Sequence, residues 1–352
     1  MIPHERHTLI LRQIELHGMV ITAELAVGHG VSAMTVRRDL EELERRGLLR
    51  RVHGGAVARS SSAATAWRHR RPVATIGMVV PSADYYFPGV VRGARAAAGQ
   101  LGVRLVLGVS DYSTDREVEQ VRRLLDNGVD GLLVTPSQSF DQDRTTYRLL
   151  AQQDVPAVVV ERSLEGADPG MPIGGVRSDH AHGAELAVRH LLDRGHTRVA
   201  VAWRAGPTAG PVLAGVRRAM AALCPDGETT DVAIPADGTP ATEQRARLEG
   251  VLDDLLAGGY RAVVVLPDQA AMSLVDIALA RGLRVPGDLA LIGYDDEFAG
   301  LAGVPLTAVA PPKFDVGHTA LRTCFDRLRA RAVSTTLTRV ALLPTLAVRD
   351  ST

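Results

Sequence analysis

Residues 75–109, TIGMVVPSADYYFPGVVRGARAAAGQLGVRLVLGV, contain the features of a strand, a helix and a second strand in that order. The runs 75–80 and 103–109 are apolar, strand-sized and rich in β-branched residues. Between them, apolar side chains recur at the spacing of one helix face, at Val90, Ala94, Ala97 and Leu101. This change of period from strand to helix and back predicts a parallel strand pair joined by a crossover helix.

The same alternation continues to the end of the chain. Further apolar runs of strand length are found at 129–135, 157–160, 198–202, 262–266 and 289–293, with amphipathic stretches between them. Strands that alternate with helices predict an α/β fold with parallel sheets. With 352 residues the chain is too long for one ordinary domain, so two or three folded units are expected.

Composition favours a folded protein of the cytoplasm. Hydrophobic residues make up 46% of the chain and charged residues 23%, which is typical of soluble globular proteins. No apolar run is long enough to span a bilayer, and residues 1–7 lack the apolar core of a signal peptide. The two cysteines, Cys224 and Cys324, form neither a disulfide framework nor a zinc site by themselves. We therefore expect no membrane partner and a reducing compartment.

Charge distribution and local composition divide the chain into segments. Residues 1–71 carry 12 Arg against 7 Asp or Glu, a balance of +5 in a chain whose net charge is zero. The segment 58–72 has no apolar period, is rich in Ser and Ala, and ends in a basic run before Pro72. We predict a DNA-binding unit at 1–57, a linker at 58–72 and a larger domain at 73–352.

The N-terminal unit has the pattern of a helix-turn-helix. Ser32 is placed to cap a helix in which Val36, Leu40 and Leu43 form the buried stripe. Side chains on the other face suit a DNA major groove, because they sit near the helix N-terminus and include two arginines. The alternative is that these arginines only form a solvated helix face. Residues 48–57, LLRRVHGGAV, predict two short strands around a glycine turn, the wing of a winged helix.

These strings resemble the winged helix-turn-helix of DeoR-type regulators. The resemblance covers about residues 4–57 and is carried by VSAMTVRRDL at 31–40 and GLLRRVHGGA at 47–56. It implies a double-stranded DNA operator as partner. The implied DNA-contacting residues are Ser32, Met34, Thr35, Arg37, Arg38, Arg51, His53 and Gly54.

Residues 73–352 resemble the effector domain of LacI/GalR-type repressors. Motifs along the whole length carry it: GVDGLLV at 128–134, VPAVVVER at 155–162, HLLDRGH at 190–196, GLRVPGDLALIGYDD at 282–296 and LPTLAVRDST at 343–352. The resemblance implies a two-lobed, periplasmic-binding-protein-like fold of type I that pairs as a homodimer. The combination with a DeoR-type domain is a hybrid, and the LacI-type hinge-helix sequence is absent.

A cleft between two lobes is the expected site for a small-molecule effector, and a sugar-like ligand would need polar side chains with an aromatic platform. After the first strand, Asp84 is a candidate hydroxyl acceptor, and Tyr86 and Phe87 are candidate stacking rings. Core or dimer surface is the alternative for both rings. Glu161 and Arg162 follow the strand 157–160 and either bind ligand or form a local ion pair.

The second half supplies Asp268, after the strand 262–266, and Asp295, which either lines the cleft or caps a hinge. Two sugar contacts implied by the family are missing, because Val212 stands where an Arg is common and Pro311 where a Gln is common. These departures imply weaker binding or a less polar ligand.

Other chemistry has little support. His180 and His182 lie two residues apart, so on a helix they point about 200° apart and cannot share a metal ion. Asp179 is better interpreted as an N-cap, and His190 and His196 as structural residues. No nucleophile elbow, phosphate loop or dinucleotide fingerprint is found.

Three functions remain: a DNA-binding regulator, a solute receptor, and an enzyme that uses the α/β cleft. The winged helix favours the first, and no catalytic set supports the third. We expect an allosteric, non-enzymatic regulator without cofactor or metal, working as a homodimer on an operator with two half-sites. The sequence leaves open whether the effector releases or recruits DNA.

Overall fold

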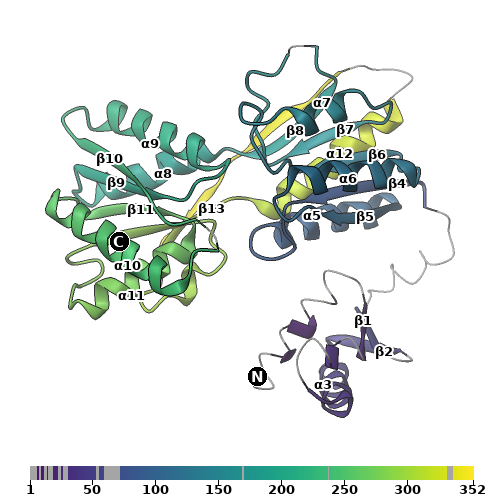
Figure 1. Cartoon of the computed structure of the whole chain (residues 1–352), viewed down its shortest axis with the longest axis horizontal. Helices are drawn as coiled ribbons and strands as arrows, with labels where there is room; N and C mark the ends of the chain where they lie inside the picture. Colours follow the sequence, from purple (N-terminus) through teal and green to yellow (C-terminus); the bar gives the residue numbers. More distant parts are fainter. Residues whose placement is uncertain are drawn as a thin grey trace.

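The structure is a computed structural model. It describes residues 31–52, 55–58, 72–168, 170–236, 238–330 and 336–352, and between residues 6 and 26 it describes 6–7, 9–11, 14, 19–22 and 25–26. Beyond the N-terminal domain, the chain forms two α/β lobes connected by strands that pass between them (Figure 1).

The first lobe is built on a six-stranded sheet in which all neighbours are parallel. The order is β14-β8-β7-β6-β4-β5, and the strands are β4 (Ala74–Val80), β5 (Val103–Val109), β6 (Gly131–Val134), β7 (Ala157–Val160), β8 (Ile173–Ser178) and β14 (Arg339–Leu342). In β4 every residue is buried, because helices cover both faces of the sheet. Helices α5 (Phe87–Leu101) and α12 (Lys313–Ala330) pack on one face, and α6 (Thr114–Asp126) and α7 (Thr145–Ala151) on the other.

The second lobe repeats this plan with one reversed strand. Its order is β10-β9-β11-β12-β13-β15, with strands β9 (Arg198–Trp203), β10 (Glu228–Ala233), β11 (Ala262–Leu266), β12 (Ala290–Tyr294), β13 (Thr307–Ala310) and β15 (Thr345–Ala347). Only β15 runs antiparallel to its neighbour. Helices α8 (His180–Asp193) and α9 (Ala209–Leu223) cover one face, and α10 (Ala241–Ala257) and α11 (Asp268–Ala280) the other, with the 3-10 helix η1 (Ala299–Leu301) beside α11.

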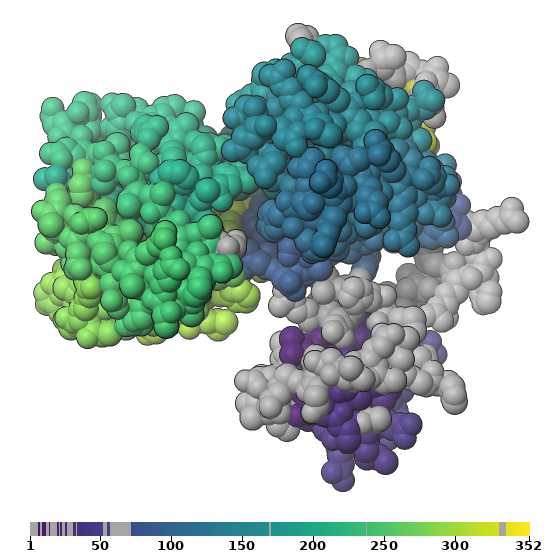
Figure 2. Space-filling model, in the orientation of Figure 1, coloured from purple at the N-terminus to yellow at the C-terminus, as the bar shows by residue number. Residues whose placement is uncertain are grey.

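Three segments connect the lobes. The chain passes from β8 to α8, returns from β13 to α12, and passes again from β14 to β15. Figure 2 shows the lobes as two masses joined at a narrow waist. The last residues then add to the second lobe, where Ser351 is fully buried and its hydroxyl donates to the carbonyl of Leu291 at 2.6 Å.

The N-terminal domain contains helix α3 (Ala33–Arg45) and a three-stranded sheet of order β1-β3-β2. Strands β2 (Leu49–Val52) and β3 (Gly55–Ala58) form the expected antiparallel wing, and β1 (Met19–Ile21) adds to its edge. Val36, Leu40 and Leu43 are buried as the helical stripe predicts.

The sequence misses the strands that lack an apolar run. β8 contains two adjacent glycines, and β10 lies at a sheet edge with four of its six residues exposed. The expectation for Asp179 is confirmed, since its carboxylate caps α8 by accepting from the N–H of His182 at 3.0 Å. Within the described part of the chain, no helix is both long and apolar enough to cross a bilayer.

Candidate functional site

The candidate DNA-binding surface begins at the N-terminus of α3. Ser32 caps the helix, because its hydroxyl accepts from the N–H of Thr35 at 3.1 Å and lies 2.9 Å from the Thr35 hydroxyl. Both predicted base-facing residues that follow, Met34 and Arg38, are exposed, with Met34 at 68%.

Arg37 and Arg38 are exposed on α3 and form no ion pair with any residue that the structure describes. Helix α3 itself is held from behind by a buried ion pair. Arg6 donates through Nε and Nη2 to the carboxylate of Asp39 at 2.8 and 3.1 Å, and His7 lies 3.0 Å from the same carboxylate. This pairing fixes the rotation of α3, so the two free arginines face away from the domain core.

The wing is tied to the same helix by Arg51. Its Nε donates to Glu44 at 3.0 Å and its Nη1 to Glu41 at 2.5 Å, while its backbone N–H donates to Glu44 at 2.8 Å. Arg51 therefore positions the wing, and a phosphate contact would require it to leave both glutamates. Its neighbour Arg50 is exposed and forms no ion pair with a carboxylate in the described part of the chain. His53 and Gly54 lie outside the described residues.

In the first lobe the candidate effector site forms around Glu161, which directly follows β7. Its carboxylate accepts from the hydroxyls of Tyr86 and Ser178 at 2.7 and 2.9 Å and from the Ser178 N–H at 2.9 Å. His180 lies 3.9 Å from the same group, and burial lowers the pKa of His180, so the imidazole is neutral near pH 7. Glu161 itself is 5% exposed.

The aromatic residues after β4 separate into different roles. Phe87 is buried in the core of the first lobe with α12, so the prediction that its ring stacks on an effector is wrong for this conformation. Tyr86 is half-buried and points at Glu161, with the Lys313 ammonium 5.3 Å from its ring centre. Asp84 is exposed beside them.

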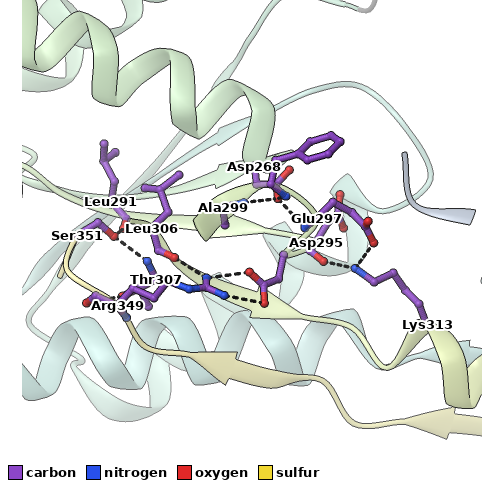
Figure 3. Close-up of polar contacts among 12 residues, drawn as sticks. Asp268, Leu291, Asp295, Glu297, Ala299, Leu306, Thr307, Lys313, Arg349 and Ser351 are labelled. Atoms are coloured by element: carbon purple, nitrogen blue, oxygen red, sulfur yellow. Dashed lines mark hydrogen bonds and ion pairs between the residues drawn. The ribbon is translucent and has the colours of Figure 1, made fainter. Parts of the chain in front are cut away.

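Asp268 is the first residue of α11 in the second lobe and is fully buried. Its Oδ2 accepts from the backbone N–H groups of Glu297, Phe298 and Ala299 at 2.8, 2.9 and 3.2 Å (Figure 3). Its Oδ1 accepts from the hydroxyl of Tyr85, which belongs to the first lobe. Both carboxylate oxygens accept hydrogen bonds within the protein, so Asp268 positions the loop 297–299 and connects it to Tyr85.

Asp295 follows β12 and faces the first lobe. Burial, with the neighbouring charge of Asp268, raises its pKa to about 7. Lys313, at the start of α12, donates to the Asp295 carbonyl and pairs with Glu297 at 2.6 Å. Figure 3 shows these contacts beside those of Asp268. Of the two roles that the sequence leaves open for Asp295, the cleft-lining one fits this position.

The backbone at this site is unusual. Glu161 has φ 55° and Asp295 has φ 98°, in a region that side-chain-bearing residues rarely adopt. Asp296, at φ 53°, is held there by Arg349, whose guanidinium lies 2.8 and 3.1 Å from its carboxylate. Strain of this kind persists where surrounding contacts impose it, and it is concentrated at functional sites.

Arg162 does not pair with Glu161. Its guanidinium donates to the backbone carbonyls of Pro136 and Glu161, at 2.7 and 2.8 Å, and it is 7% exposed. The departure at Val212 is a core position, since this side chain is fully buried among residues of α8, α9 and β9. Among the described residues, no group of three or more His, Cys, Asp or Glu side chains is placed to hold a metal ion.

Sequence reasoning misses four residues of the interlobe site: Tyr85, Ser178, Glu297 and Lys313. They come from four separate segments, and only the fold brings them together. One signal does exist in the sequence, because Lys313 is the only lysine among 352 residues. The structure places this lysine between the lobes, where its side chain is 13% exposed.

Two family models match the chain. A DeoR-like helix-turn-helix domain matches residues 6–62, and a periplasmic binding protein-like domain matches residues 188–352. The first match falls on the N-terminal domain. The second falls on a region that contains most of the second lobe, together with α12 and the C-terminal strands. They agree with the hybrid architecture that the sequence motifs indicate.

Similar proteins are regulators of transcription. The arabinose metabolism transcriptional repressor of Geobacillus stearothermophilus is 29% identical over 94% of this chain and 90% of its own length. The regulator DegA of Bacillus subtilis is 26% identical over 79% of this chain and 80% of its own. A LacI transcriptional regulator from a Rhodococcus species has a TM-score of 0.65 at 26% identity, covering 79% of this chain and 98% of that structure. The chain is therefore a non-enzymatic, DNA-binding transcriptional regulator in which residues 6–62 match a DeoR-like helix-turn-helix domain and residues 188–352 match a periplasmic binding protein-like domain.

Proposed function

We propose that the effector is a hydroxyl-rich metabolite of the sugar class and that it binds between the lobes. The observation that carries the proposal is the polar ring around the waist, where Glu161 and Tyr86 face Asp295 and Lys313. Carboxylates and an ammonium can exchange their present partners for sugar hydroxyls in charge-assisted hydrogen bonds. Two relatives are named as repressors of arabinose metabolism, which supports a sugar-related ligand.

Each residue has a proposed role at this site. Glu161 accepts ligand hydroxyls, Tyr86 offers a ring face and a hydroxyl, and Asp295 accepts or donates according to its protonation. Asp84 completes the rim. Asp268 supports the site from behind, because its carboxylate is already engaged with the protein. Arg162 supports it through Nε and Nη1, which donate to backbone carbonyls.

The mechanism is a shift between two relative positions of the lobes. A ligand that touches both lobes favours the closed arrangement only through its higher affinity for that state. The three segments that connect the lobes transmit this change in lobe position to the first lobe. The predicted linker 58–72 precedes the first lobe in the chain. DNA binding then depends on how the two copies of the winged helix are spaced.

We propose that α3 enters the major groove, with Met34, Thr35, Arg37 and Arg38 toward base edges and phosphates and Ser32 at the helix N-terminus. The wing, with Arg51, His53 and Gly54, would follow the backbone. A homodimer would place two such helices on an inverted-repeat operator. We place this dimer in the cytoplasm, with the nucleoid as its DNA-bound location.

An experiment in two steps tests this function. A thermal-shift screen of pentoses, hexoses and their disaccharides identifies a ligand, and fluorescence anisotropy then measures operator affinity with and without it. We expect Glu161→Gln to weaken ligand binding about tenfold or more while ligand-free DNA affinity stays unchanged. Glu119→Gln, on an exposed position of α6, is the matched control. Ligand binding that survives Glu161→Gln unchanged would remove the effector from the interlobe site.

A further inference from the structure

A second cavity lies in the first lobe, away from the waist. It has a volume of about 420 Å³ and is bounded by the loop 162–167 after β7 and by β8 and β14. Three arginines line it, one from each of these segments: Arg162, Arg177 and Arg339. One acidic side chain, Glu165, also lines it, and this side chain is 85% exposed.

The arginines around this cavity have few anionic partners. Arg162 is more than nine-tenths buried and forms no ion pair among the described residues, since its two hydrogen bonds go to backbone carbonyls. Arg177 reaches Glu165 only at 3.5 Å and otherwise donates to the Ser178 carbonyl at 3.3 Å. Arg339 is exposed and pairs with no carboxylate that the structure describes.

Burial of a guanidinium without a direct ion pair is unfavourable, and desolvation lowers the pKa of Arg162, while the charges of Glu161 and Glu117 oppose this only in part. An anion in the cavity would offset this cost. Guanidinium groups are planar forks that match the oxygens of phosphate and carboxylate in pairs, and they lose less hydration than ammonium groups when they do so. A cavity of this volume accepts a small metabolite.

We infer that this cavity is a binding site for a small phosphate-bearing metabolite, separate from the interlobe effector site. Arg162 forms the floor of the site, and Arg177 and Arg339 close on the phosphate from β8 and β14. Glu165 turns outward to solvent when the anion is present, since its contact with Arg177 is long and exposed.

The position of the cavity connects it to regulation. Arg162 is the next residue after Glu161, and Arg177 precedes Ser178, whose N–H and hydroxyl hold the Glu161 carboxylate. The third wall, β14, runs on through residues 343–344 into β15 of the second lobe. An anion therefore touches both the backbone behind the effector site and a strand that crosses between the lobes. Coupling of this kind is reciprocal, so phosphate and effector alter each other's affinity by the same factor.

Calorimetry with the full chain and inorganic phosphate tests the site, at constant ionic strength kept with chloride. We expect saturable binding with a dissociation constant on the order of 1 mM or tighter. Arg339→Gln and Arg177→Gln should each weaken it about tenfold or more. Arg218→Gln, an exposed arginine on α9 of the second lobe, should leave it unchanged.

Two further experiments identify which ligand binds and at which site. Glucose 6-phosphate compared with glucose separates a phosphate-bearing metabolite from free phosphate, and tighter binding of the ester supports the metabolite. Lys313→Gln tests the alternative location. Phosphate binding that is lost with Lys313→Gln and kept with Arg339→Gln overturns the inference, as does the absence of saturable binding. The measurements with inorganic phosphate use neither DNA nor a sugar, so their failure is distinct from failure of the proposed function.

Discussion

The hydroxyl of Tyr85 in the first lobe donates to the carboxylate of Asp268 in the second. This contact spans the waist, and the Tyr85 ring also packs against Phe298 with ring centres 5.7 Å apart. Asp268 holds three backbone N–H groups of the loop 297–299 at the same time. One tyrosine therefore links the first lobe directly to the loop that carries Asp295.

We expect Tyr85→Phe to weaken the link between the lobes by about 1 kcal/mol, the net contribution of a typical hydrogen bond. Because Asp268 keeps its three backbone donors, the second lobe should stay folded. The effector affinity of Tyr85→Phe should change by a factor of about five, and small-angle scattering should show a larger radius of gyration without ligand. Tyr260→Phe, which removes a hydroxyl far from the waist, is the control. Equal affinity and equal scattering in both variants would argue that this contact has no part in lobe closure.

A second prediction concerns pH. The pKa of Asp295 is raised to about 7 by burial and by the Asp268 charge, while Lys313 opposes this. Tyr85 and Glu297 also face this group. The folded state then holds a proton that the unfolded chain releases near pH 4, so the stabilisation present at acid pH is lost as pH rises toward 7.

Asp295→Asn should therefore raise the melting temperature by a few degrees at pH 8 and leave it nearly unchanged at pH 5. Asparagine suits the positive φ of this position, so the backbone need not move. Differential scanning calorimetry at both pH values measures the effect, with Asp226→Asn on an exposed turn as control. An equal shift at the two pH values would contradict a raised pKa.

DNA binding should depend on the two unpaired arginines of α3. Arg38→Ala should cost about 1–3 kcal/mol of operator affinity if the side chain forms a bidentate base contact, and specificity should fall with it. If Arg38 contacts only a phosphate, its loss should instead weaken binding to all DNA sequences alike and reduce the salt slope by about one. Anisotropy over a salt series separates the two results, and Arg218→Ala serves as control. Unchanged affinity of the Arg37/Arg38 double alanine variant would refute α3 as the recognition helix.

Sequence patterns locate buried strands well and miss edge strands, for a physical reason. The runs 157–160 and 262–266 coincide with the central strands β7 and β11, because strands covered on both faces are continuously apolar. The edge strand β5 is an exception, since its run 103–109 is apolar although most of its residues are only partly buried. β10 and β14 lie at sheet edges, where exposure removes the apolar signal. β8 is central, but Gly174 and Gly175 interrupt its apolar run.

Some residues of the candidate effector site can be predicted from the sequence and others cannot. Glu161 and Asp295 can be predicted, because each follows the end of an apolar run and strand ends are where α/β folds bind ligands. The contacts of Arg162 and Asp268 cannot, since only the fold brings Nε and Nη1 of Arg162 to backbone carbonyls and Oδ2 of Asp268 to backbone N–H groups. Lys313 comes from a helix more than 150 residues after Glu161, so no local pattern relates the two.

Dimer formation should depend on an exposed apolar surface in the second lobe. Leu301 in η1 is 76% exposed and Leu279 at the end of α11 is 42% exposed, and these elements are in contact. Exposed leucines on adjoining elements are typical of interfaces. We expect Leu301→Glu to shift the protein from dimer to monomer in sedimentation velocity at micromolar concentration, while Leu223→Glu on α9 does not. A dimer that persists in Leu301→Glu would move the interface elsewhere.

The final prediction tests the helix crossing that supports the waist. Helices α5 and α12 approach so closely that a Cβ on Gly317 would lie 1.8 Å from the carbonyl oxygen of Val90, and one on Gly93 would lie 1.8 Å from that of Phe314. Gly317→Ala therefore forces the helices apart, and overpacking of this kind costs about 1–3 kcal/mol or more. Since α12 carries Lys313 at its first turn, the shift should also weaken effector binding.

Gly99→Ala is the matched control, because it lies on α5 with no atom within 4 Å of a built Cβ. It should stabilise the protein by up to about 1 kcal/mol through helix propensity alone. Chemical denaturation of both variants, followed by circular dichroism, measures the opposite signs. A Gly317→Ala variant as stable as Gly99→Ala would mean that α5 and α12 can separate freely, and α12 could then not hold Lys313 in place between the lobes.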